Sequence, residues 1–102
     1  MNADIERLRA RIDALDARAI GVLAERFRLV SELARLKQEA GVPIEDAARE
    51  GRLRESHDRA ARQEGLDPEI ADAIFVAVLN ASKRLQARAS GENGSSGDTD
   101  GA

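Results

Sequence analysis

Three basic residues are spaced so that they face the inside of a helical assembly. Arg26 occupies a seam position where an apolar residue is expected, in a run of apolar residues at alternating three- and four-residue steps. Lys37 follows three helical turns later, so both cations point to nearly the same side of a helix. Arg9 lies four heptads before Lys37, on one edge of the seam. Because buried cations are costly unless an anion compensates them, the pattern favours a small, multiply anionic ligand with carboxylates or phosphates.

Each of these cations also has a purely structural explanation. A lone polar residue such as Arg26 can fix the register of paired helices, or its side chain can extend from the edge of a core into water. Arg9 and Lys37 can be solvated charges that flank the seam. At this point both the structural and the ligand-binding interpretations stay open.

Two further polar groups are placed where they can complete such a binding site. Asp46, Arg49 and Glu50 begin a second predicted helix and would cover the open end of the anion pocket. Ser82 and Gln86 are one turn apart, at the polar end of a stripe on a third predicted helix. In the structural interpretation, Asp46 is only an N-cap, and the pair on the third helix bonds to the backbone or faces solvent.

Three helices are predicted to position these residues. The seam predicts one long helix over residues 4–40, ended by Gly41. The second helix begins after Asp46 and ends at Gly65, and the third opens with Asp67-Pro68 as N-cap and first helical residue. Helix formers dominate and aromatic residues make up only 2% of the chain, so the predicted fold class is all-α.

The length of the first helix predicts a partner. At 1.5 Å per residue it would run roughly 55 Å, whereas a compact domain of about 100 residues has a radius of gyration of about 13 Å. Its apolar stripe would project into water unless a second chain covers it. We therefore expect an obligate homodimer, in which an antiparallel partner helix would bring Arg9 of one chain near Lys37 of the other.

Composition and charge argue against several functions. The 102 residues include no cysteine and one histidine, His57, so disulfides, thiolate catalysis, metal sites and Ser-His-Asp relays are not expected. With 16 basic and 19 acidic residues, the net charge of −3 argues against nucleic-acid binding. The sequence shows no signal peptide and no apolar run of membrane-spanning length, so we expect a cytoplasmic protein without membrane contact. The Gly-, Ser- and Asp-rich residues 90–102 are expected to be a disordered tail after one helical domain, residues 1–89.

In chain order, the residues form motifs that are weak alone and specific in their combined spacing. The set is Leu8-Arg9-x-x-Ile12-Asp13-x-Leu15-Asp16, Leu23-x-x-Arg26, Lys37, Pro43-Ile44-x-Asp46-x-x-Arg49-Glu50 and Ser82-x-x-x-Gln86. Over residues 5–88 this set resembles the all-helical, type II chorismate mutases. The resemblance implies an intertwined homodimer of three-helix chains, with two active sites that both chains share. It also implies conversion of chorismate to prephenate, a unimolecular rearrangement that needs no cofactor, no metal and no proton transfer.

The resemblance further implies roles for the residues that would bind the substrate carboxylates. Arg26 and Arg9 of the partner subunit would each bind one carboxylate. Arg49 would help to position a carboxylate and the polar network, and Ser82 would contact a carboxylate.

The other four residues of the set would act on the remaining oxygens of the substrate. Lys37 and Gln86 would donate hydrogen bonds to the ether oxygen, where negative charge builds as the C–O bond breaks. Asp46 and Glu50 would hold the ring hydroxyl.

Three other functions stay open at the level of sequence. Relatives of the same fold rearrange 4-amino-4-deoxychorismate in antibiotic biosynthesis, and Asp46 and Glu50 would accept its ammonium group as readily as a hydroxyl. Other relatives eliminate pyruvate from isochorismate. A non-catalytic helical dimerisation module would explain the seam but not the inward-facing Arg26. The sequence is also compatible with an activating partner enzyme.

Overall fold

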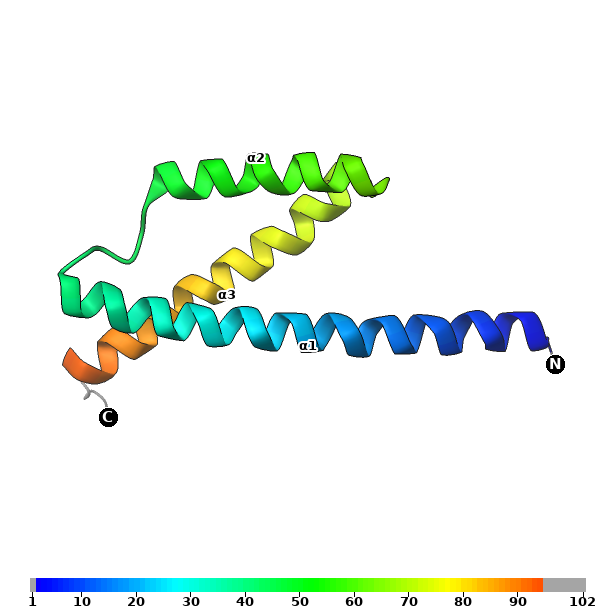
Figure 1. Cartoon of the computed structure of the whole chain (residues 1–102), viewed down its shortest axis with the longest axis horizontal. Helices are drawn as coiled ribbons and strands as arrows, with labels where there is room; N and C mark the ends of the chain where they lie inside the picture. Colours follow the sequence, from blue (N-terminus) through cyan, green and yellow to red (C-terminus); the bar gives the residue numbers. More distant parts are fainter. Residues whose placement is uncertain (1, 95–102) are drawn as a thin grey trace.

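The computed structural model describes residues 2–94 of the chain. Over these residues it contains three helices and no strand: α1 (Ala3–Ala40), α2 (Ala47–Glu64) and α3 (Pro68–Gly94) (Figure 1). The predicted all-α class and the long first helix are confirmed. α3 includes residues 90–94, which the composition placed in the tail. No proline interrupts the helix there, and the rest of the predicted tail lies outside the described residues.

Each helix begins at a side chain that accepts backbone N–H groups of the first turn. Asn2 caps α1 by accepting from two N–H groups. Asp46 caps α2 through the N–H of Arg49, at 3.0 Å. Asp67 accepts from the N–H of Glu69, at 2.9 Å, where α3 begins. Such caps satisfy donors that have no partner within the helix, and the two aspartate caps were predictable from their type and position.

The first two helices end at glycines in the left-handed conformation. Gly41 has φ 70° and Gly65 has φ 74°. The N–H groups of these glycines and of the residues that follow them bond to carbonyls of the last helical turn. Glycine adopts this conformation without the steric penalty that a Cβ brings, so both predicted helix ends are confirmed.

α3 connects the other two helices. It packs against α2 over its first part and crosses α1 near the C-terminal end of that long helix (Figure 1). The N-terminal half of α1 extends away from both other helices. The described chain is therefore elongated, with a longest dimension of 56 Å and a radius of gyration of 18.0 Å, against about 13 Å for a compact domain of this length.

The apolar core is small and lies where α3 meets its neighbours. α1 contributes only Val30 and Ala34 to the buried residues. Large apolar side chains of its N-terminal half are about half exposed, namely Ile5, Leu8, Ile12 and Leu15. Despite this exposed stripe, none of the described helices is long and apolar enough to cross a membrane. The single chain thus leaves an apolar stripe of α1 uncovered.

The glycine within α2 and the glycine that follows its last residue predict opposite effects of the same substitution. Gly65→Ala should lower the free energy of unfolding by about 1–2 kcal/mol, because it puts a side chain in the left-handed region. Gly51→Ala, within the helix, should raise it by about 0.5–1 kcal/mol. A Cβ at either position meets no atom within 4 Å, so only the backbone conformation differs. Urea denaturation at one protein concentration measures both changes in the free energy of unfolding. If the two substitutions changed it in the same direction, the left-handed conformation of Gly65 and the helical conformation of Gly51 would be contradicted.

Candidate functional site

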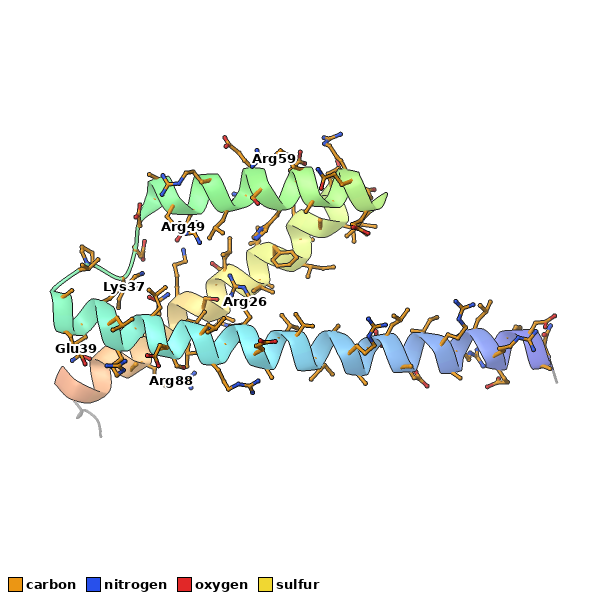
Figure 2. All side chains as sticks on the ribbon, in the orientation of Figure 1. Arg26, Lys37, Glu39, Arg49, Arg59 and Arg88 are labelled. Atoms are coloured by element: carbon orange, nitrogen blue, oxygen red, sulfur yellow. The ribbon has the colours of Figure 1, made fainter. Side chains whose placement is uncertain are left out.

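One cavity collects most of the residues that the sequence pattern selects. It has a volume of about 230 Å³ and lies between the C-terminal half of α1, the start of α2 and the later turns of α3. Figure 2 shows Arg26, Lys37 and Arg49 around the space between α1 and α2. Seven of the eight predicted site residues line the cavity: Arg26, Lys37, Asp46, Arg49, Glu50, Ser82 and Gln86. Leucine, valine and isoleucine side chains complete its walls.

Arg26 is held at the cavity by a buried serine. Its Nη1 donates a hydrogen bond of 2.7 Å to the Oγ of Ser82. The Ser82 hydroxyl in turn donates to the carbonyl of Val78 at 2.9 Å, so its own proton is engaged one turn back in α3. Ser82 is only 5% exposed. The serine therefore orients the guanidinium and leaves the other N–H donors of Arg26 directed elsewhere.

Positive charge is concentrated at this end of the cavity. Burial lowers the pKa of Arg26, and the charge of Arg49 lowers it further. A guanidinium nevertheless stays protonated in proteins, so two cations face the same space. An anion placed between them would relieve this repulsion, which is the electrostatic condition for a carboxylate-binding site.

Lys37 is fixed by two hydrogen bonds from different parts of the chain. Its Nζ donates to the carbonyl of Ile44 at 2.9 Å and to the Oε1 of Gln86 at 3.1 Å. Gln86 is only 6% exposed, and its oxygen is turned toward the ammonium. An ammonium has three N–H donors, and a side-chain amide also carries an NH₂ group. The pair can therefore offer further donors to one ligand atom.

The two carboxylates of the cavity have different surroundings. Asp46 is engaged as the N-cap of α2 through its Oδ1. Glu50 pairs with Lys83, with Oε2 and Nζ 3.3 Å apart and both side chains about one third exposed. Lys83 also lines the cavity, and it is not among the residues that the sequence pattern selects. The composition of the chain offered the one sequence indication of Lys83, because the chain has only two lysines and both lie at this site.

Arg9 does not reach the cavity of its own chain. Its side chain is exposed and pairs with Glu6, with Nη1 and Oε2 2.9 Å apart. Seventeen helical residues separate Arg9 from Arg26, which corresponds to roughly 25 Å along α1. The structure thus groups seven of the predicted residues and leaves the eighth at the far end of the helix.

His57 lies partly buried between α2 and α3. Its ring is 4.2 Å from the ring of Phe75, measured between centroids. Among the described residues, its Nδ1 is a buried atom without a hydrogen-bond partner. Burial lowers the pKa of His57, and the charge of Arg26 lowers it further. The imidazole is therefore favoured in its neutral form.

A wider cleft runs along α2 and the start of α3, beside His57. Four of its charged side chains are paired with one another. Arg54 makes a forked contact with Asp72, with the shortest distance 2.9 Å, and Arg62 lies 2.9 Å from Asp58. Within residues 2–94, no group of three or more His, Cys, Asp or Glu side chains is arranged to hold a metal ion.

The sequence of the chain matches a known family and several curated proteins. The family described as chorismate mutase type II matches residues 8–87. A chorismate mutase from Methanocaldococcus jannaschii is 28% identical over 82 residues, which cover 80% of this chain and 83% of that protein. A 4-amino-4-deoxychorismate mutase from Streptomyces venezuelae is 28% identical over 83 residues, which cover 81% of each. The T-protein of Enterobacter agglomerans is 30% identical over 82 residues, which cover 80% of this chain but only 22% of that protein.

The lowered pKa of His57 predicts a loss of stability on acidification. The unfolded chain takes up a proton as the pH falls through the ordinary value of 6.5, whereas the folded chain resists protonation until a lower pH. The stability that neutral His57 contributes is thus complete above pH 6.5 and is lost below it. His57→Leu should therefore show a smaller drop in urea midpoint between pH 8 and pH 5.5 than the wild type. An equal drop in both proteins would contradict this assignment.

Proposed function

Because the chain belongs to the chorismate mutase type II family, we propose that it is an isomerase that converts chorismate to prephenate. The observation that carries the proposal is the single cavity lined by Arg26, Lys37 and Arg49 together with buried Ser82 and Gln86. A dicarboxylate substrate suits a cavity in which cations outnumber acids. The relative from Methanocaldococcus jannaschii, which carries the name chorismate mutase, supports the same activity.

The carboxylates of the substrate would be held by the arginines. Arg26 keeps donors beyond the one that Ser82 accepts, and a guanidinium binds a carboxylate through two parallel N–H bonds. Arg49 lies close enough to Arg26 to affect its pKa, so a carboxylate near both would be attracted by two charges. Ser82 would position Arg26, and its hydroxyl would contact the bound carboxylate by exchanging its bond to the Val78 carbonyl for one to the ligand.

The rate acceleration would come from Lys37 and Gln86. As the ether C–O bond breaks, negative charge develops on its oxygen. Donors that are already fixed in place stabilise this charge more in the transition state than in the ground state, which raises the rate of the step. Lys37 is fixed in this sense, because Ile44 and Gln86 hold it from two sides. The apolar walls would hold the flexible enolpyruvyl arm over the ring and add an orientation effect.

The ring hydroxyl would lie at the α2 end of the cavity. Asp46 and Glu50, both in the wall, carry carboxylate oxygens that accept a hydrogen bond. The reaction requires no nucleophile, metal, cofactor or proton transfer, so binding, orientation and charge stabilisation account for all the roles assigned to these residues.

The proposed active unit is an intertwined homodimer of residues 1–89, in the cytoplasm. The half-exposed side chains Ile5, Leu8, Ile12 and Leu15 form a continuous apolar stripe on α1 that a second copy would cover. In an antiparallel arrangement, the N-terminal half of α1 would bring Arg9 of the partner subunit to the cavity. Arg9 would then exchange its exposed pairing with Glu6 for a substrate carboxylate.

A second candidate is rearrangement of 4-amino-4-deoxychorismate. The Streptomyces venezuelae relative carries that name, and the two acids of the cavity would accept an ammonium group. Isochorismate pyruvate lyase and the non-catalytic dimerisation module rank below both mutases. A partner enzyme that raises the activity stays a prediction.

The Lys37→Ala variant, assayed beside the wild type, tests both the proposed mutase activity and the catalytic role of Lys37. We expect purified wild-type protein to convert chorismate to prephenate, identified by mass and chromatography, and the variant to lose about a hundredfold or more in kcat. Arg35→Ala is the matched control, because Arg35 lies on the same helix but pairs with Glu32 and Glu39 at the surface. Unchanged turnover in Lys37→Ala would remove the lysine from the mechanism. Absence of prephenate from the wild-type reaction, with 4-amino-4-deoxychorismate and isochorismate assayed in parallel, would overturn the proposed activity.

The shared active site predicts recovery of activity from two inactive variants. Arg9→Ala and Lys37→Ala should each be nearly inactive as homodimers. After the two are unfolded together and refolded in equal amounts, half of the dimers contain one chain of each kind. Each mixed dimer has one intact site, so about one quarter of the wild-type activity should return for a two-fold symmetric pair. Full activity of Arg9→Ala alone, or no recovery on mixing, would contradict a site built from both chains.

A further inference from the structure

Lys83 adds a cation beside one of the two acids of the cavity. It follows Ser82 on α3 and lines the same cavity as Glu50. The two side chains form an ion pair across α2 and α3, with 3.3 Å between Nζ and Oε2. Both are about one third exposed, so the pair is partly shielded from water. Among the described residues that line the cavity, Arg26, Lys37, Arg49 and Lys83 are cationic, while Asp46 and Glu50 are anionic.

The pairing changes what Glu50 can recognise. An unpaired carboxylate attracts an ammonium group by charge and accepts a hydrogen bond from a hydroxyl. A carboxylate that already faces a lysine keeps oxygen lone pairs for a hydroxyl, but its charge is largely compensated. An ammonium in that place would also lie close to the ammonium of Lys83 and be repelled by it.

We infer that Lys83, through its ion pair with Glu50, makes this cavity select a neutral hydroxyl over an ammonium group on the substrate ring. The inference rests on the proposed mutase function and names the specificity of the same site. Lys83 also attracts the substrate carboxylates, but chorismate and 4-amino-4-deoxychorismate both carry them. That attraction therefore cancels when the two substrates are compared, and the ratio of their kcat/KM values reports the effect at the ring substituent alone.

The test is the selectivity of Lys83→Met, which removes the charge and keeps an unbranched apolar stem. The wild type should favour chorismate, and the variant should shift the ratio of kcat/KM values by about tenfold or more toward the amino substrate. Lys83→Arg should keep the wild-type preference, because it keeps the charge. Arg84→Met is the matched control, since it removes a cation from an exposed position of α3 that does not line the cavity.

The role of Glu50 in this effect can be measured separately. In a Glu50→Gln background the carboxylate is absent, so adding Lys83→Met should change the ratio much less than it does in the wild type. Damage to the fold would lower the rates with both substrates and leave the ratio unchanged.

Three results would overturn the inference. They are an unchanged ratio in Lys83→Met, an undiminished shift in the Glu50→Gln background, and a wild-type preference for the amino substrate with Lys83 in place. Each of these leaves the mutase activity itself established. Absence of turnover of both substrates by the wild type would instead overturn the proposed function, and the inference with it.

Discussion

The structure depends on two hydrogen bonds through which α3 holds cations of α1. Ser82 accepts from Arg26 and Gln86 accepts from Lys37, and both acceptors are almost fully buried. Leaving such a group without a partner costs about 1–3 kcal/mol. The donors are roughly 16 Å apart along α1, whereas the acceptors are roughly 6 Å apart along α3. The two long basic side chains must therefore converge where the helices cross, and this fixes the register of α3 on α1.

This convergence gives the cavity its electrostatic character. The hydrogen bonds that satisfy Ser82 and Gln86 also bring positive charges close together, and the charge of Arg49 lowers the pKa of Arg26. The two acids of the cavity are engaged with other partners, because Asp46 is a helix cap and Glu50 is paired with Lys83. Neither of them forms an ion pair with Arg26 among the described residues. A ligand with two carboxylates supplies the missing negative charge, so the free site is organised for an anion before it binds one.

Much of this arrangement was predictable from local patterns in the sequence. The heptad seam, the aspartate caps and the two left-handed glycines set the helix boundaries, and these depend on interactions within a few residues. The break in the seam at Arg26 indicated an anion-binding cavity as one of the open interpretations, because a buried cation is costly unless an anion compensates it. Ser82 and Gln86 were selected by their place at the polar end of a helical stripe, a pattern that also fits an exposed helix end, and the spacing relative to a known family then assigned them roles.

The features that were not predictable depend on contacts between helices. Lys83 stands out in the sequence only as one of two lysines, and its role follows from the fold, which brings it to 3.3 Å from Glu50, more than thirty residues earlier in the chain. His57 lies on a weakly apolar helix, and its ring contacts Phe75 only because the fold brings α3 beside α2. α3 also continues through the polar and glycine-rich residues 90–94, whose composition placed them in the tail. Nucleating a helix is costly whereas extending one is not, so composition alone does not locate the last turn.

The division of α1 into two halves links stability to activity. Its C-terminal half supplies Arg26 and Lys37 and packs against α3, whereas its N-terminal half leaves a row of large apolar side chains exposed. A chain with so small a core gains little from folding alone. In the proposed dimer, the surface that would complete the core of one chain also carries Arg9, which would complete the active site of the other. Association would then stabilise the fold by mass action and assemble the site in the same step. A substitution on the exposed apolar stripe of one chain would weaken the dimer. It would consequently lower the activity at the cavity of the partner chain, to which that stripe would bring Arg9.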